Sequence, residues 1–167
     1  VWIPELIFGR LRTSTNYNKS EEKIVGGKNG FGFKLVLIWS TTGSVETVDH
    51  KRGLKYTQAF HNNLEVIDEP KITKCRNKPY TRITFKPDYA RLGLPGLTQH
   101  MIALFRRRVY DVAALTGRGV RVKCDSVLVP VKTFAQYVDL YLETAAKKVC
   151  DAPHERWDIA VALAPSH

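Results

Sequence analysis

Two hydrophobic periodicities alternate along this chain of 167 residues, and their order constrains the fold more than any other feature. Four runs alternate apolar and polar residues, as strands with one buried face do, and they begin near Val45, Thr81, Val120 and Trp157. Between them, apolar residues recur at intervals of four and three from Leu97 to Leu115, which indicates an amphipathic helix. Strands and helices interspersed in this way predict an α+β fold with a mixed sheet.

Several further elements follow from composition along the chain. A second helix is expected from about Lys132 to Ala146, and a short apolar element spans Trp2 to Leu11. The polar stretch from Thr13 to Lys28 is expected to form a long surface loop. Loops of this length are uncommon inside compact domains and often serve as lids over sites, although a floppy insertion is the alternative. A domain boundary is expected at Asp151–Pro153, because a strand begins just after it.

The chain is strongly basic, with 26 Lys and Arg residues against 16 Asp and Glu residues and a formal net charge of +10. Such a balance attracts polyanions, namely DNA, RNA, nucleotides or an acidic membrane, while a basic surface kept for solubility is the alternative. No apolar run approaches the ~20 residues of a membrane span, so a soluble protein is expected, and a membrane is not among the partners that we expect. Three cysteines without a CxxC spacing predict a reduced compartment and no structural zinc.

The segment from Gly26 to Ser40, GGKNGFGFKLVLIWS, places four glycines and a lysine directly before an apolar run. The run predicts a buried helix of about two turns, with a buried strand as the alternative. The GxxxxGK[ST] phosphate loop requires lysine where this chain has Phe33, and GxGxxG requires a third glycine where it has Leu35. The pattern that remains is G-x-x-G-x-G, at Gly27, Gly30 and Gly32.

Two polar residues in this region need partners. Lys34 falls in the first helical turn, where a cation is unfavourable by a few tenths of a kcal/mol because the helix N-terminus is itself positive. An anion bound there would explain the lysine, and a lysine that extends out to solvent is the alternative. Thr81 shares a strand face with Ile83 and Phe85, so its hydroxyl is expected to be buried against either a ligand or a core acceptor.

These segments resemble a known family. IPELIFGRLRTSTNYNKSEEKIVGGKNGFGFKL, TRITFKPD, RRRVYDVAA, VPVKTFAQYVDLYL and ERWDIAVAL resemble, in colinear order, the ATPase region of eukaryotic-type DNA topoisomerase II. The resemblance implies a GHKL (Bergerat-type) ATPase fold, a two-layer sandwich that binds ATP and Mg²⁺ between a sheet-backed pocket and a lid. It further implies that residues 1–152 form the C-terminal part of the ATPase domain and that residues 153–167 begin the transducer domain.

The resemblance also assigns site residues. It implies that Ser14, Thr15 and Asn16 contact the sugar and phosphates of the nucleotide, and that Thr81 lies near the adenine. The glycine-rich phosphate loop would comprise Gly27, Lys28, Asn29, Gly30, Phe31, Gly32, Phe33 and Lys34. Phe33 stands where the family has a small alanine, and we expect its side chain to point into the core so that nucleotide binding is retained.

The chain begins with Val1 rather than Met and ends at His167 directly after a strand-like run, so we expect it to be a fragment of a longer protein. Other residues of the family's site would then lie outside it. The general-base glutamate, the metal-holding asparagine and the adenine-reading aspartate would lie upstream, and the lysine that reaches the γ-phosphate would lie downstream. We therefore expect no catalytic residue, no metal ligand and no ATPase activity in this polypeptide alone.

For the parent protein, the resemblance implies ATP-driven dimerisation that passes one DNA duplex through another. Its partners would be double-stranded DNA and a second copy of the chain, and its location would be the nucleus. The alternatives are another GHKL ATPase, of the chaperone, mismatch-repair or sensor-kinase type, and a non-catalytic basic module that binds nucleic acid. The segment around Lys78 and Tyr80 favours the last of these only faintly.

Overall fold

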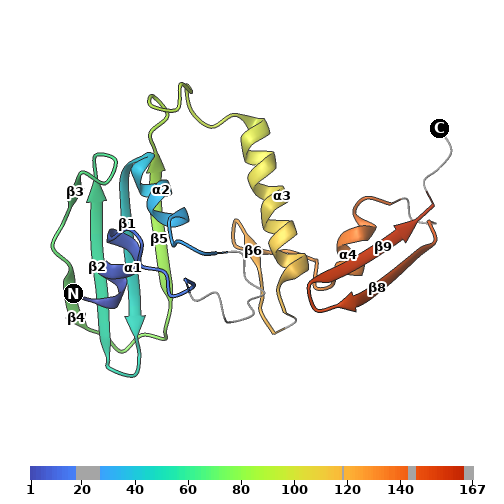
Figure 1. The fold of residues 1–167 in the computed structure, drawn as a ribbon, viewed down its shortest axis with the longest axis horizontal. Helices are drawn as coiled ribbons and strands as arrows, with labels where there is room; N and C mark the ends of the chain where they lie inside the picture. Colours follow the sequence, from blue (N-terminus) through green and yellow to red (C-terminus); the bar gives the residue numbers. More distant parts are fainter. Residues whose placement is uncertain (18–26, 118, 143–145, 164–167) are drawn as a thin grey trace. The chain divides into compact units, whose positions relative to one another are not determined.

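The computed structural model describes residues 1–17, 27–117, 119–142 and 146–163 (Figure 1). The chain divides into two compact units, 1–96 and 97–167. Residues 18–26 of the predicted loop lie outside the described residues, so the lid prediction is not tested over that stretch. In the described ranges, no helix is long and apolar enough to cross a membrane.

The first unit is built on a five-stranded sheet with the order β3-β2-β1-β5, in which β4 also pairs with β2. The strands are β1 (Ser40–Asp49), β2 (Leu54–His61), β3 (Val66–Ile67), β4 (Lys71–Lys74) and β5 (Thr81–Pro87). The run at Val45, the weakest alternation in the sequence, therefore belongs to the central strand of the sheet. Every strand pair in the described residues is antiparallel, whereas a mixed sheet was expected.

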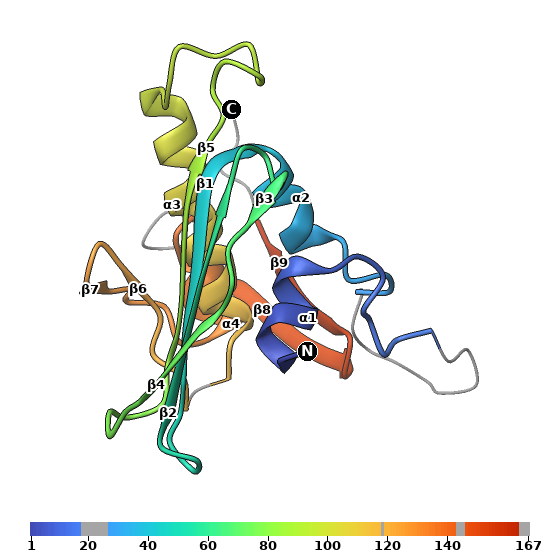
Figure 2. The same ribbon diagram turned by 90° about the vertical axis from the view of Figure 1, so that its left-hand side faces the viewer.

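Two short helices, α1 (Ile3–Gly9) and α2 (Gly32–Ile38), cover one face of this sheet, as Figure 2 shows. The helix predicted after the glycines is thus confirmed, and the strand alternative is wrong. The core between the two layers centres on Leu37, Val45 and Phe60, each with only 1% of its surface exposed. This layering of helices on a sheet agrees with the two-layer arrangement that the resemblance implies.

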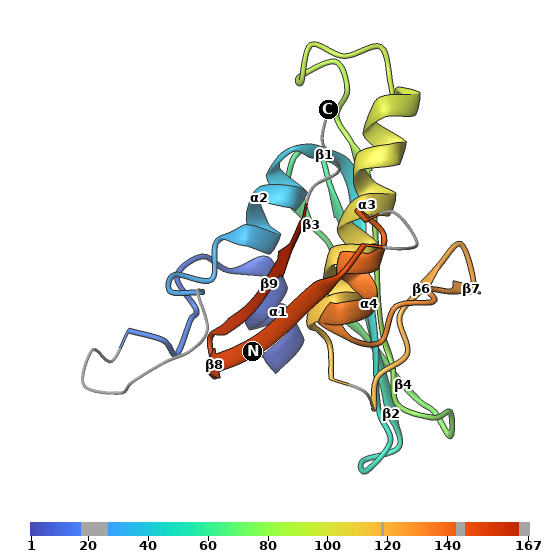
Figure 3. The ribbon, with the colours of Figure 1, turned by 90° about the vertical axis from the view of Figure 1, so that its right-hand side faces the viewer.

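The described residues of the second unit form two helices and two β-hairpins. They are α3 (Gln99–Leu115), β6 (Lys123–Cys124) paired with β7 (Val127–Leu128), α4 (Phe134–Asp139), and β8 (Lys148–His154) paired with β9 (Trp157–Ala162). Both helices begin at a threonine cap: Thr98 accepts a hydrogen bond from the Met101 amide at 3.3 Å, and Thr133 accepts one from the Gln136 amide at 3.2 Å. Figure 3 shows α4 beside the β8–β9 hairpin.

The helices and strands predicted in this unit exist, but several differ in length and in the face that is buried. The helix expected from Lys132 ends at Asp139, and the strand expected from Val120 is reduced to two residues. The expected stripe of α3 is largely exposed, since Phe105 and Val112 keep about half of their surface. The buried residues are small ones instead, namely Ala113, Ala114, Val129 and Val131.

The proposed domain boundary falls inside a secondary-structure element. Asp151, Ala152 and Pro153 lie within β8, and β8 pairs with β9 across the expected boundary. Backbone contacts divide the chain between Gly96 and Leu97 instead. A division of contacts does not define functional domains, so an ATPase part over 1–152 and a transducer part from 153 stay a prediction.

Candidate functional site

The start of the predicted lid is tied to the glycine loop by hydrogen bonds. The Asn16 side-chain amide donates to the Gly27 carbonyl at 2.8 Å, and the Tyr17 hydroxyl donates to the Asn29 carbonyl at 3.4 Å. The structure therefore places Asn16 beside the glycine loop, although eleven positions separate it from Gly27, and the nucleotide contact that the resemblance implies for both stays a prediction. Both segments belong to the first unit.

Lys34 is buried and contacts both the start of the predicted lid and the glycine loop. Its ammonium donates to the Thr13 hydroxyl at 3.0 Å and to the Gly30 carbonyl at 2.8 Å, and only 3% of the residue is exposed. The alternative of a lysine that extends to solvent is therefore wrong. Burial lowers the pKa of Lys34, because desolvation disfavours its charged form.

The charge of Lys34 is not neutralised within the described part of the chain. No carboxylate there forms an ion pair with its ammonium, and both of its hydrogen-bond partners are neutral oxygens. An ammonium has three N–H donors, so these partners leave one donor for a further acceptor. A buried cation without a counter-ion is costly, and an anion at this place would remove that cost.

Gly30 adopts a backbone conformation that only glycine enters easily. Its φ is +69°, and a Cβ at this position would lie 3.3 Å from the Ser14 amide nitrogen and 3.6 Å from the Lys34 ammonium. The glycine therefore permits both the left-handed turn and the close approach of the lid segment. Gly27 and Gly32 have open space around them, so they do not share this requirement.

The remaining predicted phosphate-loop and sugar-contact residues lie at the surface of the same region. Ser14 is half-buried, and its hydroxyl accepts a hydrogen bond from the backbone N–H of Asn16 at 3.0 Å, which closes a local turn. Thr15, Lys28 and Asn29 are exposed, so their side chains remain accessible to a ligand. The first turn of α2 carries no side-chain cap, which leaves its amide groups without a side-chain acceptor.

Phe33 points away from the loop surface. Its ring meets that of Phe8 edge to face, with ring centroids 4.8 Å apart and an interplanar angle of 77°, and it packs on the core around Leu37. The predicted orientation is confirmed, whereas the retention of nucleotide binding stays a prediction. Phe31 instead lines an open pocket of about 440 Å³ together with Arg12, Tyr17 and Asn29.

Thr81 does not join this cluster. Its hydroxyl lies 2.9 Å from that of Thr47, at the far end of β1 from α2, and in the described residues no hydrogen bond links it to the glycine loop. The expected burial of Thr81 is wrong, because the residue is exposed. The reason is that β5 is an edge strand, which pairs only with β1 among the described residues.

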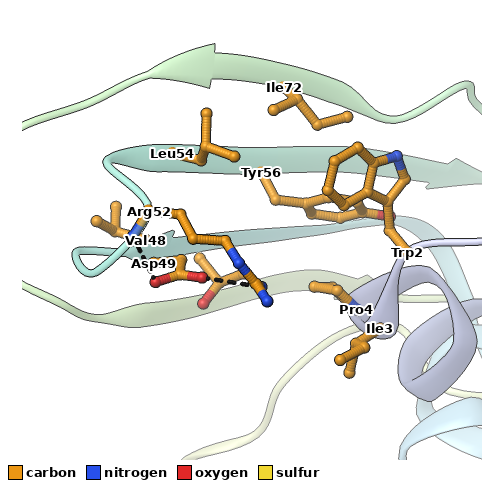
Figure 4. A pocket seen from close by; sticks show the side chains of 10 residues that line it. Trp2, Ile3, Pro4, Val48, Asp49, Arg52, Leu54, Tyr56 and Ile72 are labelled. Carbon is orange, nitrogen blue, oxygen red and sulfur yellow. Dashed lines mark hydrogen bonds and ion pairs between the residues drawn. The ribbon is translucent and has the colours of Figure 1, made fainter.

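A second pocket, of about 250 Å³, lies in the first unit away from the glycine loop (Figure 4), and its lining includes Thr47, the hydrogen-bond partner of Thr81. Its lining comes from the start of α1 and from β1, β2 and β4: Trp2, Ile3, Pro4, Thr47, Val48, Asp49, Arg52, Leu54, Tyr56 and Ile72. Burial raises the pKa of Tyr56 to about 12, so its hydroxyl stays protonated at neutral pH. The mainly apolar lining supplies one guanidinium, that of Arg52, which is already paired with Asp49 at 3.2 Å.

The hydrogen-bonded residues at the glycine loop form what we call the loop cluster: Thr13, Ser14, Asn16, Tyr17, Gly27, Asn29, Gly30 and Lys34. Sequence reasoning missed two of them. Thr13 accepts from Lys34, and Tyr17 binds the Asn29 carbonyl, yet neither was predicted as a site residue. Thr13 lies 21 positions from Lys34, and no spacing rule connects a loop residue to a helix residue at that distance. The only signal was the position of both residues within the predicted lid.

A helix layer on an antiparallel sheet, with a glycine-rich loop at the start of α2, is consistent with the GHKL-type ATPase fold that the resemblance implies. The structure is similar to the ATPase region of Saccharomyces cerevisiae topoisomerase II, with a TM-score of 0.90 and 39% identity over 99% of this chain and 44% of that one. It is also similar to the ATPase and transducer domains of DNA topoisomerase II from Balamuthia mandrillaris, with a TM-score of 0.86 and 39% identity over 97% of this chain and 42% of that one.

The sequence comparison points to the same proteins. The chain is 41% identical to DNA topoisomerase 2 of Arabidopsis thaliana over 98% of its own length, and it spans 12% of the length of that relative. No protein-family model matches the chain. The chain is a homologue of part of the ATPase region of DNA topoisomerase 2.

Proposed function

We propose that this chain forms the glycine-loop and lid part of the ATP-binding clamp of a type II DNA topoisomerase. In the parent protein, ATP binding and hydrolysis would drive dimerisation and the passage of one DNA duplex through another. The observation that carries the proposal is the buried Lys34 ammonium, which is tied to the Gly30 carbonyl and lacks a carboxylate partner within the described residues. Similarity to the ATPase region of topoisomerase II supports it.

The residues of the loop cluster have distinct parts in this proposal. Lys34 supplies a positive charge and a free donor to the phosphates, and the uncapped amides at the start of α2 supply further donors. Gly30 holds the turn that brings Ser14 and Asn16 beside the loop, where they would meet the sugar and phosphates. Thr81 would have to act from a separate place on the sheet, near the adenine.

The magnesium ion is proposed as the companion of the bound nucleotide. Within the described residues, no group of three or more His, Cys, Asp or Glu side chains is placed to hold a metal. Double-stranded DNA, a second copy of the protein and a nuclear location likewise belong to the proposal for the parent enzyme.

The decisive experiment compares phosphate binding by the chain and by Lys34→Met. Calorimetric titration would use a non-hydrolysable ATP analogue with Mg²⁺ and, separately, inorganic triphosphate. A hydrogen bond to a charged group contributes about 1.5–3 kcal/mol, so binding of both probes should weaken about 10- to 150-fold. Lys86→Met is the matched control, because Lys86 is an exposed lysine on β5, and it should bind as the unaltered chain does.

Folding and binding can be separated in the same experiment. Methionine has a similar length and removes a buried charge, so the urea midpoint of Lys34→Met should stay level or rise. If Lys34→Met remains folded and binds both probes with unchanged affinity, the assignment of this loop to phosphate binding is wrong.

A further inference from the structure

The β1–β2 turn and the connection from β4 to β5 meet at one end of the sheet in the first unit. Lys74 lies opposite Leu54 in the β2–β4 register, and the Cys75 amide donates to the Gly53 carbonyl at 2.8 Å. On the other side, the Val48 amide donates to the Tyr80 carbonyl at 3.0 Å. Backbone hydrogen bonds therefore fix the segment 75–80 beside the turn, although more than 20 positions separate them in the sequence.

Four cationic side chains at this place, Lys51, Lys74, Arg76 and Lys78, form what we call the basic sheet end. All four are exposed. Among the described residues none of them has an ion-pair partner. Unpaired surface cations gathered on one edge create a local positive potential that a single dispersed lysine does not.

The neighbouring cations each have a carboxylate partner, which sets the basic sheet end apart. Arg52 pairs with Asp49 at 3.2 Å and lies along the pocket that Figure 4 shows. Lys55 and Arg82 share the carboxylate of Glu46, at 3.3 and 3.4 Å. The cations without a carboxylate partner therefore lie on the β1–β2 turn and on the connection from β4 to β5.

The dimensions of this end suit a polyanion with closely spaced charges. Neighbouring strands lie about 4.8 Å apart, so the strand order β4-β2-β1-β5 makes the end about 14 Å wide. Duplex DNA carries one charge per about 1.7 Å of its axis, so about eight phosphates fall within that width. A single strand of the duplex has one charge per about 3.4 Å, so about four of its phosphates span this width, as many as there are cations in the basic sheet end.

The aromatic content argues against a single-stranded ligand. Single strands bind mainly by stacking bases on exposed aromatic rings. Tyr80 is the aromatic residue of this connection, but its hydroxyl donates to Glu46 and the Arg82 guanidinium lies 5.4 Å from its ring centroid. Its face is therefore already occupied by a cation, and phosphate contacts carry the recognition.

We propose that the basic sheet end binds the phosphate backbone of double-stranded DNA. The inference rests on the proposed function only for the choice of DNA among polyanions. It gives the chain a DNA contact that is separate from the glycine loop and that does not depend on bound nucleotide.

The test is a titration of duplex binding at several salt concentrations, in which the fluorescence anisotropy of a labelled 20-base-pair DNA reports binding. The variant Lys74→Gln/Arg76→Gln/Lys78→Gln removes three charges from the basic sheet end of the full chain. The slope of log K against log salt should fall in magnitude by about 2.7, since each phosphate contact contributes about 0.9. At 0.1 M salt the affinity should fall at least tenfold.

A matched control removes the same charge elsewhere. Arg121→Gln/Lys123→Gln/Lys132→Gln changes three exposed cations of the second unit, so it lowers the net charge equally, and its slope should fall by less than 1. Equal losses in the two variants would show a general charge effect and overturn the inference. It would also be overturned if single-stranded DNA bound as tightly as the duplex, or if poly-glutamate displaced the duplex at equal charge concentration.

Nucleotide binding is measured in the same samples, so that the two proposals fail separately. The charge variant should bind the ATP analogue as the unaltered chain does, because none of its three substitutions touches the glycine loop. A chain that binds no ATP analogue but shows the expected loss of salt dependence would sink the proposed function and leave the DNA contact standing.

Discussion

The left-handed turn at Gly30 gives the sharpest prediction for the loop cluster. In Gly30→Ala, the new Cβ would lie 3.3 Å from the Ser14 amide nitrogen and 3.5 Å from the Ser14 Cβ, while the backbone would keep a φ of +69°. Lys34 donates to the carbonyl of this same residue, so a shift of the turn also moves the acceptor of the buried ammonium. The substitution therefore perturbs the lid contact and the lysine together.

The magnitude follows from two contributions. A left-handed conformation costs an L-residue about 1–2 kcal/mol relative to glycine. The contact with Ser14 adds to this cost, because a backbone atom must give way by a few tenths of an ångström. If the loop must hold its present turn to bind phosphates, then 1–2 kcal/mol corresponds to about a 5- to 30-fold weaker affinity for the ATP analogue.

Two companion variants separate the causes. Gly32→Ala meets open space at the start of α2, so it should bind within about twofold of the unaltered chain and should gain up to about 1 kcal/mol in unfolding free energy. Gly30→Asn carries the same Cβ but tolerates the left-handed region better, so it should lose less affinity than Gly30→Ala.

Calorimetric titration with the ATP analogue gives the affinities, and urea unfolding followed by circular dichroism gives the stabilities. The reasoning is refuted if Gly30→Ala binds the analogue as tightly as the unaltered chain while remaining folded. If Gly30→Asn binds more weakly than Gly30→Ala, the close contact rather than the backbone angle is the dominant cost.

Three further outcomes are expected. Gly43→Ala should lower the unfolding free energy by about 1–3 kcal/mol in urea melts, because its Cβ would lie 2.4 Å from Cδ2 of the buried Leu37. Phe33→Ala should lower the unfolding free energy by a similar amount, about 1–3 kcal/mol, because a half-buried ring is lost. Its affinity for the nucleotide should not rise tenfold, since such a rise would show that the Phe33 ring crowds the loop. The Tyr80 hydrogen bond lowers the pKa of Glu46 in the folded protein. The ionised Glu46 therefore stabilises the fold fully above the pKa that it has in the unfolded chain, and this stabilisation is lost as the pH falls through its pKa in the folded protein. Glu46→Gln should therefore flatten the loss of stability between about pH 5 and pH 3 in acid titrations.

Local patterns in the sequence predict where elements form but not which face they bury. The spacing from Leu97 to Leu115 predicts α3, and the capping threonine Thr98 fixes its start. The same spacing predicts burial for Phe105 and Val112, which are half exposed, while Ala113 and Ala114 are buried. Periodicity reports that one face of a helix is apolar, but the layer that covers a face comes from segments distant in the sequence.

The strands show the same limit. Alternation predicts β5 and β9 correctly, yet Phe85 and Trp157 are exposed at 48% and 64%. The central strand β1 has the weakest alternation in the sequence, because Val48 is buried on the face opposite to Val45. A strand in the middle of a sheet can be covered on both faces, and this weakens the period-two signal that identifies it.

The candidate site was predictable where backbone geometry depends on one residue type. Glycine spacing predicts a turn before α2, and Gly30 supplies the left-handed residue of that turn. What could not be predicted is the reason that Lys34 is tolerated at the start of a helix. Its ammonium is enclosed by Thr13 from the lid and by the Gly30 carbonyl, so the charge is solvated by neutral oxygens from two segments.

That arrangement links stability to binding. A buried ammonium with only neutral partners keeps most of its desolvation cost, and burial lowers the pKa of Lys34 as this cost requires. Neither Thr13 nor the Gly30 carbonyl can remove the cost, since neither carries a charge. A phosphate can, and the uncapped amides of α2 lie in the same turn as the lysine. The loop is therefore less stable alone than it would be with an anion, and this difference is what a ligand would gain on binding.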